Sequence, residues 1–364
     1  MAQEKTNKIR KALRWQFPTP VTQKDVSSFC RGFSILIQSG IPVLKSLKTL
    51  AVRTSQPKLR KALGEVARFV ENGGTVSRAM ENYPRYFNPL IVSMIRVGES
   101  SGTLDEALHR IADLMEKSVA LRQKLKSAFA YPLVSLLVAL GVIIFLLMRV
   151  IPVFIPLFKN SERNIQIPVP TQMIIFVSEI LQMHWPLVLV ALCLLGVLFW
   201  ILKNTERGKY LYDRFELKIP VFGMLYTKVV VARFTRTMSV LLHSGVPLLE
   251  ALQLSKAVTG SLNMSITIQN AYDNLVKGGT FEEVLRDSDI IPPLAVDIIS
   301  VGEQAGTLEE VLERIAMTYE EEIDVTIRGI TSIIEPILVL VVGSVVLFIA
   351  LSVFLPYFAL IKIL

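Results

Sequence analysis

Apolar residues recur at helical spacing along most of this chain, and no segment shows the strict alternation that is typical of a β-strand. From residue 21 onward the pattern divides into helices of about 8–20 residues, which are separated by short turns rich in Gly, Pro and Asn. Val21–Ser39 is such a helix; Gly40 ends it and Pro42 begins the next one, where a missing N–H costs nothing. The pattern predicts an all-α protein. The apolar stripe of the first helix consists of Val26, Phe29, Cys30, Phe33, Leu36 and Ile37.

Three long apolar runs could cross a membrane, for which about 20 helical residues suffice. The first is Leu133–Met148, and it extends to Phe158 if Arg149 reaches the interface. The second is interrupted only by His184, and the third, which begins at Pro336, carries no charge. We therefore expect transmembrane helices at 131–158, 180–202 and 335–361, with a short extracytoplasmic loop at 159–179.

The chain also repeats itself. Val97–Ala112 and Val301–Ala316 are identical at eleven of sixteen positions, and Phe29–Leu47 and Phe234–Leu252 at nine of nineteen. A glycine pair followed by threonine, at Gly73, returns in the same order, and every match is offset by 204 or 205 residues. Collinear matches at one offset indicate a duplication. Each copy predicts a six-helix antiparallel bundle, the first at 21–130 and the second at 203–334.

The longest repeated motif is expected to be a junction between two helices. We expect Gly98 and Gly302 to close the preceding helix in a left-handed conformation. Thr103 and Thr307 are then each followed by glutamate three residues later, the pattern of a capping box at the start of the next helix.

Two repeated pairs of charges are not needed for the helical core. Arg31 and Arg236 lie off the apolar stripe of their helices, and Glu99 and Glu303 lie outside the capping boxes. One hypothesis is that Arg31 pairs with Glu99 and Arg236 with Glu303; the alternative is four independent surface charges. The candidate structural and interaction residues are Arg31, Gly40, Pro42, Gly98, Glu99, Gly102, Thr103, Arg236, Gly245, Pro247, Gly302, Glu303, Gly306 and Thr307.

Composition supports a membrane protein, because 52% of the 364 residues are hydrophobic and the mean hydropathy is +0.49. The net charge of +8 is unevenly spread: residues 1–130 hold 22 Lys+Arg and 10 Asp+Glu, whereas 203–334 hold 13 and 18. Basic residues lie before the first span and after the second, whereas 159–179 holds only Lys159 and Arg163. Both bundles should therefore face the cytoplasm of a multi-pass protein, and no nucleic-acid partner is required. Residues 1–20 are read as a basic N-terminal arm.

Catalytic chemistry is not indicated. The three histidines lack zinc-site spacing, the two cysteines are isolated, and no phosphate-binding loop is present. We therefore expect no catalytic, cofactor-binding or metal-binding residues and no enzyme activity.

The helices entering the membrane differ in charge, since the first copy has four basic residues where the second has four acidic ones. These charges lie either on solvated faces or on surfaces that meet partners or each other. They are Lys117, Arg122, Lys124 and Lys126, and Glu320, Glu321, Glu322 and Asp324.

The repeated pattern F-x-R…S-G-x-P, followed by V-G-E-x-x-G-T-L, resembles the type II secretion F family over residues 21–364, including the Tyr131-Pro132 and Glu335-Pro336 membrane entries. The resemblance implies a non-enzymatic platform in the bacterial inner membrane, part of a type IV pilus or type II secretion machine. Its implied partners are a cytoplasmic assembly ATPase, pilin or pseudopilin subunits, other inner-membrane assembly proteins, the lipid bilayer and further copies of the chain. Many family members are longer before the first bundle. The alternative function is a small-molecule or ion secondary transporter, which would show broken helices and polar residues at mid-span.

The charge bias generates a testable topology. Single cysteines replacing Ser55 and Asn263 should react with an impermeant thiol reagent only after the cytoplasm is opened, whereas a cysteine at Asn160 should react from outside. Labelling of position 160 from the cytoplasmic side alone would contradict the orientation.

Overall fold

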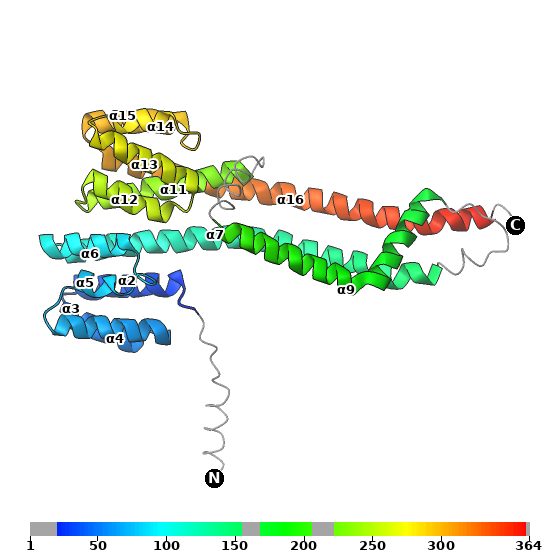
Figure 1. The fold of residues 1–364 in the computed structure, drawn as a ribbon, viewed down its shortest axis with the longest axis horizontal. Coiled ribbons are helices and arrows are strands. Elements are labelled where there is room, and N and C mark those ends of the chain that lie inside the picture. Colours follow the sequence, from blue (N-terminus) through cyan, green and yellow to red (C-terminus); the bar gives the residue numbers. More distant parts are fainter. Residues whose placement is uncertain (1–19, 155–167, 206–221, 362–364) are drawn as a thin grey trace, which may run out of the picture. The chain divides into compact units, whose positions relative to one another are not determined.

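The computed structural model describes residues 20–154, 168–205 and 222–361, and every regular element in these ranges is a helix (Figure 1). The predicted N-terminal arm lies outside the described residues except for Pro20. Contacts divide the chain into two compact units. Unit 1 comprises Met1–Gln123 and Thr227–Glu320, and unit 2 comprises Lys124–Tyr226 and Glu321–Leu364.

Unit 1 contains two series of helices in the same order. The first series is α2 (Gln23–Gln38), α3 (Val43–Arg53), α4 (Pro57–Glu71), α5 (Val76–Glu81), α6 (Pro89–Ser101) and the start of α7 (Leu104–Phe145). The second is α11 (Phe222–His243), α12 (Leu248–Thr259), α13 (Leu262–Val276), α14 (Phe281–Arg286), α15 (Pro293–Ala305) and the start of α16 (Leu308–Ile361).

The two series turn at equivalent residues. Gly40 and Gly245 have φ of 75° and 78°, a left-handed conformation that glycine adopts without steric cost. The amide of the following residue then bonds a carbonyl five residues back, at 3.0 Å in both copies, which closes the helix. Pro42 and Pro247 are the N-cap residues of α3 and α12. These predicted helix ends are therefore confirmed.

The cores of the two series use equivalent positions. Phe29 stacks on Phe33 and meets Phe87, with ring centroids 5.7 Å apart in both pairs, while Phe234 meets Phe281 at 6.4 Å. Buried apolar residues recur at the repeat offset, so the same side-chain directions point inward in both copies. The matched buried pairs include Phe33 and Met238, Leu47 and Leu252, Leu63 and Ile268, Met80 and Leu285, Ile95 and Ile299, and Leu108 and Leu312.

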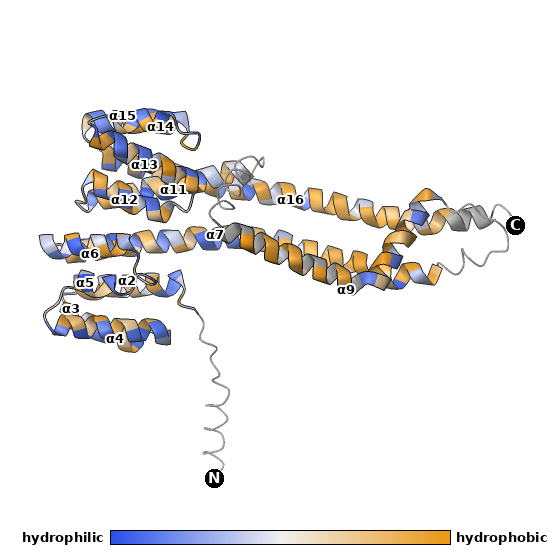
Figure 2. Ribbon diagram, in the orientation of Figure 1, coloured by the Kyte–Doolittle hydropathy of each residue, from blue (hydrophilic) through white to orange (hydrophobic). Residues whose placement is uncertain are grey.

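Two helices in the described part of the chain are long and apolar enough to cross a membrane, Leu104–Phe154 and Leu308–Leu355. Their apolar portions keep large side chains exposed, as at Leu137 (59%) and Leu340 (69%), where lipid would cover them. In Figure 2 hydrophobic residues predominate along these portions of α7 and α16 and along α9 (Val169–Asn204). The predicted span 180–202 lies within α9, and the count of three spans remains a prediction.

Prolines account for two irregularities in these helices. A π-helical segment, η1 (Leu146–Val150), precedes Pro152, where a hydrogen-bonding N–H is missing. In α9 the backbone is non-helical at His184 (φ −121°, ψ 19°), two residues before Pro186. α9 also begins at Val169, so it extends into the segment predicted as the loop 159–179, of which residues 159–167 lie outside the described ranges.

Candidate functional site at the repeated helix junctions

Gly98 and Gly302 have a different role from the one predicted. They lie inside α6 and α15, and the left-handed residues that end these helices are Gly102 (φ 75°) and Gly306 (φ 69°). A Cβ atom at Gly98 would lie 2.7 Å from Ala107 Cβ, and one at Gly302 would lie 2.8 Å from a Val311 methyl group. The prediction of a left-handed glycine at 98 and 302 was therefore wrong: these glycines allow each helix to contact the next one closely.

The capping box predicted at Thr103 is also wrong, whereas the one at Thr307 stays a prediction. In both residues the backbone carbonyl accepts the expected amide, from Ala107 at 3.1 Å and from Val311 at 3.2 Å. The Thr103 hydroxyl instead lies 2.6 Å from that of Ser101. A complete capping box does form at Thr280 with Glu283, as its sequence predicts.

Glu99 and Glu303 bind the exposed N-terminus of a short helix. Glu303 accepts the backbone N–H groups of Phe281 at 2.8 Å and Glu282 at 3.2 Å, at the start of α14. Glu99 accepts the amides of Val76 and Ser77 at the start of α5. The first amides of a helix have no partner within the helix, and a carboxylate suits both them and the helix dipole. The repeated glutamate therefore joins α6 to α5, and α15 to α14.

Arg31 and Arg236 have other partners, so the predicted Arg31–Glu99 and Arg236–Glu303 pairs are wrong. Arg31 donates through Nε (2.8 Å) and Nη2 (2.6 Å) to Glu116, and also to Asp113. Arg236 donates through Nε (2.9 Å) and Nη2 (3.0 Å) to Glu320. Each arginine therefore binds the two oxygens of one carboxylate through two parallel N–H groups on one edge of its guanidinium, which fixes direction as well as distance.

These arginine clamps join the first helix of each series to the last, α2 to α7 and α11 to α16. Glu116 and Glu320 are themselves an equivalent pair at the repeat offset, a signal that the sequence prediction missed. The second carboxylates are not equivalent: Asp113 in the first clamp and Glu313, at 3.3 Å, in the second. Burial also differs, because the Arg31 side chain is 26% exposed and that of Arg236 only 6%.

Electrostatics follow the geometry of the first clamp. The hydrogen bonds from Arg31 lower the pKa of the Glu116 carboxyl below its ordinary value. The hydrogen bonds that Arg31 donates to Glu116, and then those that it donates to Asp113, raise the pKa of the Arg31 guanidinium above its ordinary value. Both groups are charged at neutral pH, and the first clamp is therefore an ion pair throughout the physiological range.

In unit 2, α9 contacts the two proline-interrupted helices through hydroxyl groups. The buried Ser178 hydroxyl donates to the Leu147 carbonyl at 2.5 Å. Pro152 follows that carbonyl by five residues, the spacing of a π-helical bond, and has no N–H to donate to it. Ser178 therefore supplies the missing donor.

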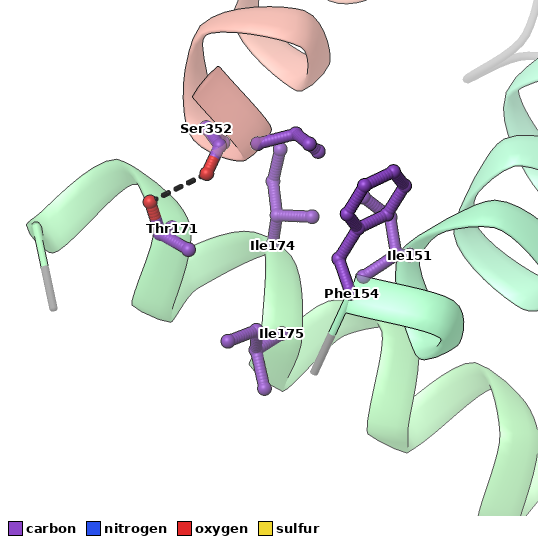
Figure 3. A pocket seen from close by; sticks show the side chains of 7 residues that line it. Ile151, Phe154, Thr171, Ile174, Ile175 and Ser352 are labelled. Atoms are coloured by element: carbon purple, nitrogen blue, oxygen red, sulfur yellow. Dashed lines mark hydrogen bonds between the residues drawn. The ribbon is translucent and has the colours of Figure 1, made fainter. Parts of the chain in front are cut away.

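The second hydroxyl has the same role at the equivalent proline. Thr171 donates to the buried Ser352 carbonyl at 2.7 Å (Figure 3), and Pro356 stands four residues later, where an α-helix would otherwise supply the donor. Pro152 and Pro356 are 204 residues apart, so the repeat extends through the apolar helices. Thr171 and Ser352 also line a small hollow whose other side chains are apolar, among them Ile151, Phe154, Ile174 and Ile175.

Two of the contrasting charges on the pre-membrane helices pair with each other. Lys124 Nζ lies 2.7 Å from Asp324 Oδ2, and both side chains are partly exposed. An ion pair of this kind contributes about 0–1 kcal/mol, so it sets a preference between α7 and α16 and does not lock them.

Cys30 and His243, two side chains that could carry chemistry, have structural surroundings in unit 1. Cys30 is fully buried, which raises its pKa to about 12 and makes a thiolate unavailable. His243 Nδ1 lies 3.1 Å from the Ser239 carbonyl. The described residues contain no group of three or more His, Cys, Asp or Glu side chains placed to hold a metal ion.

Comparison with known proteins places the chain in a family. The sequence model of the type II secretion system (T2SS) protein F family matches twice, over residues 29–152 and 234–356, in line with the two series of helices. The chain belongs to the type II secretion system protein F family. The matches begin at the repeated phenylalanines, Phe29 and Phe234, and end at Pro152 and Pro356, the two prolines of the α9 contacts. Both arginine clamps lie within the matched residues.

Members of the family have kept their similarity over nearly the whole chain. The type IV pilus assembly protein PilC of Myxococcus xanthus (strain DK1622) is 34% identical over 340 residues, 93% of this chain and 81% of the relative. PilC of Pseudomonas aeruginosa is 31% identical, with 93% and 91% covered. The type II secretion system protein F of Vibrio cholerae serotype O1 is 30% identical, with 93% and 83% covered.

Substitution of the junction glycine should separate close packing from helix propensity. We expect Gly98→Ala to lower stability by about 1–3 kcal/mol, because the new methyl group overpacks the contact with Ala107. The control is Gly64→Ala in α4, where an added Cβ has open space and should stabilise by about 0.5–1 kcal/mol. Thermal or denaturant unfolding of the full chain in detergent measures both. Equal effects at the two positions would contradict the close-contact role.

The two clamps should differ in strength because their burial differs. Arg236→Ala should cost about 2 kcal/mol, as expected for lost hydrogen bonds to charged groups at a buried side chain. Arg31→Ala should cost less than about 1 kcal/mol, since its partners are half-exposed. Unfolding midpoints of the two variants provide the comparison, and a larger loss for Arg31→Ala would show that burial does not set the order.

The first clamp should also give a pH dependence. Because the folded-state pKa of Glu116 is lowered, the clamp contributes fully above the ordinary glutamate pKa of about 4.3 and is lost as pH falls through the lower folded value. The stability difference between wild type and Arg31→Ala should therefore be constant from neutral pH to about pH 5 and close below it. A difference that persists unchanged in more acidic solution would assign the effect to packing.

Proposed function

We propose that this chain is a non-enzymatic inner-membrane platform of a type IV pilus or type II secretion machine. Support comes from its family and from relatives that are named as pilus assembly and secretion system proteins. In this proposal two six-helix cytoplasmic bundles, 21–130 and 203–334, are joined to three transmembrane helices. The partners are a cytoplasmic assembly ATPase, pilin or pseudopilin subunits, other inner-membrane assembly proteins, and further copies of the chain.

The observation that carries the mechanism is the continuity of α7 and α16. Each begins at a repeated junction in unit 1 and continues without a break into an apolar segment of unit 2. With 42 and 54 residues, they extend over about 60 Å and 80 Å at 1.5 Å per residue. A continuous helix that is held along most of its length by internal backbone bonds transmits rotation and translation along its axis. An ATPase acting on the cytoplasmic helices would thereby move the membrane segments and lift pilin-like subunits.

The contacts at the junctions suit such a role. Each arginine clamp ties the first helix of a series to the long helix, and each repeated glutamate ties the preceding helix to its neighbour. A force applied to one helix of a series would therefore reach α7 or α16 through charged hydrogen bonds and close helix contacts, with little loss of displacement. The platform acts mechanically in this scheme, and covalent chemistry stays with the ATPase.

A secondary transporter is the second candidate, favoured by the interruptions at η1 and His184. Two hydroxyls of α9 argue against it, because Ser178 and Thr171 both donate to backbone carbonyls. The hollow beside the Thr171 bond is mainly apolar. A transport site would direct such groups towards a polar substrate or a coupling ion.

Mechanical coupling predicts sensitivity to a flexible insertion. Two glycines inserted after Gln123, within α7, should abolish filament assembly while leaving membrane insertion and ATPase binding intact, because the long helix would no longer transmit motion. The matched control is the same insertion after Ser55, in the turn between α3 and α4. Sheared surface filaments, quantified against the membrane level of the protein, give the readout.

Three outcomes would contradict the proposal. Normal assembly by the Gln123 insertion variant would remove the coupling mechanism. Nucleotide hydrolysis by the purified chain without its ATPase partner, or solute uptake by vesicles that contain it, would remove the non-enzymatic platform itself.

A further inference from the structure

Equivalent faces of α6 and α15 differ sharply in exposure. In α6, Leu90 is 1% exposed and Met94 is fully buried. Their counterparts in α15, Leu294 and Ile298, are 70% and 39% exposed, and Val301 on the same face is 65% exposed. Positions on the opposite face are buried in both helices, as the matched pair Ile95 and Ile299 shows. One apolar face of α15 therefore lacks the cover that α6 has.

The second series of helices contacts α6 on this face. α6 contacts α12 within unit 1 (Figure 1), and the Ser93 hydroxyl donates to Glu250 Oε1 at 2.7 Å across that contact. Ser93 follows Leu90 by three residues and precedes Val97 by four, so it shares their face of the helix. In unit 1, α6 of the first series thus contacts α12 of the second series.

The residues equivalent to this contact in the other copy of the repeat define a second possible contact. The counterpart of α12 is α3, and the counterpart of Glu250 is Lys45, which is exposed. The counterpart of Ser93 is Asp297, whose side chain is 58% exposed and also pairs with Arg286 at 3.0 Å. A hydroxyl–carboxylate bond in the existing contact would become an aspartate–lysine ion pair in the translated one.

The surface of α3 fits this contact in a second respect. Val52 lies two helical turns beyond Lys45, on the same face, and is 79% exposed. The face of α3 therefore presents a cation and an apolar side chain, where α15 presents an anion among apolar side chains. An apolar centre with one charged pair across it is a common composition for a protein interface.

We propose that the α15 face formed by Leu294, Asp297, Ile298 and Val301 docks on α3 of a second copy of this chain, in the register in which α6 docks on α12. The long-range charges agree, because residues 1–130 carry an excess of 12 basic groups (22 minus 10) and residues 203–334 an excess of 5 acidic ones (18 minus 13). The contact joins two different surfaces, so it is head-to-tail and repeats from copy to copy. It gives an interface to the homo-oligomer of the proposed platform and rests on that part of the proposed function.

Cysteine cross-linking tests the register directly. In a Cys30→Ala, Cys193→Ala background, Asp297→Cys and Lys45→Cys are introduced singly and together, and native membranes are oxidised before denaturing electrophoresis. A head-to-tail contact predicts a ladder of covalent oligomers from the double variant and no dimer from either single one. The matched control replaces Lys45→Cys with Lys61→Cys, an exposed site on α4 (side chain 81% exposed) that should give no ladder with Asp297→Cys.

Charge reversal provides an independent readout. Asp297→Lys and Lys45→Asp alone should each reduce the oligomeric fraction of purified protein at low salt, and their combination should restore it. No greater cross-linking than in the Lys61→Cys control, dimers from Asp297→Cys alone, or cross-linking of position 297 to another protein would overturn the proposed face. If native mass measurement still finds an oligomer, the face alone is wrong; a monomer at all concentrations would also remove the oligomeric platform.

Discussion

Backbone groups left without a partner set the conditions that the rest of this structure meets. Every helix end exposes amides or carbonyls, and a proline inside a helix exposes one more carbonyl. In the apolar part of a membrane an unpaired group costs several kcal/mol. Glu99 and Glu303 accept hydrogen bonds from such amides at the short helices of unit 1. Ser178 and Thr171 donate to such carbonyls at the prolines of unit 2. The contacts between elements are placed where these groups need them.

Duplication has preserved this backbone scheme and allowed the charges around it to change. Both copies keep the glycine turns, the glutamate at a helix N-terminus and the arginine fork on an equivalent glutamate. The second carboxylate of each clamp, the burial of the arginine and the charge of the pre-membrane helices differ. Local geometry therefore constrains one set of residues, while the other set is free to respond to different surroundings.

Periodicity and repeats were sufficient to predict the helices, the turns at Gly40 and Gly245 and the family, because those features depend on nearby residues. The role of Gly98 was mistaken, since its nearest obstacle is Ala107, beyond the turn, and a sequence pattern carries no interhelical distance. The partners of the two arginines were predicted wrongly, because several acidic residues are available to each arginine. Glu116 and Glu320, which are equivalent in the repeat, would have been the better choice of partners. The hydroxyls of α9 have no periodic signal, and only the spacing of Pro152 and Pro356 pointed towards them.

The two hydroxyl contacts of α9 are made to different positions of the repeat. Ser178 holds a carbonyl five residues before its proline, and Thr171 holds one four residues before the other proline, so one helix end is π-helical at a place where its counterpart is α-helical. Loss of either hydroxyl would free one carbonyl and leave the other bound. Each of the two repeated helices therefore has its own hydrogen bond to α9, and one of these bonds can break while the other remains.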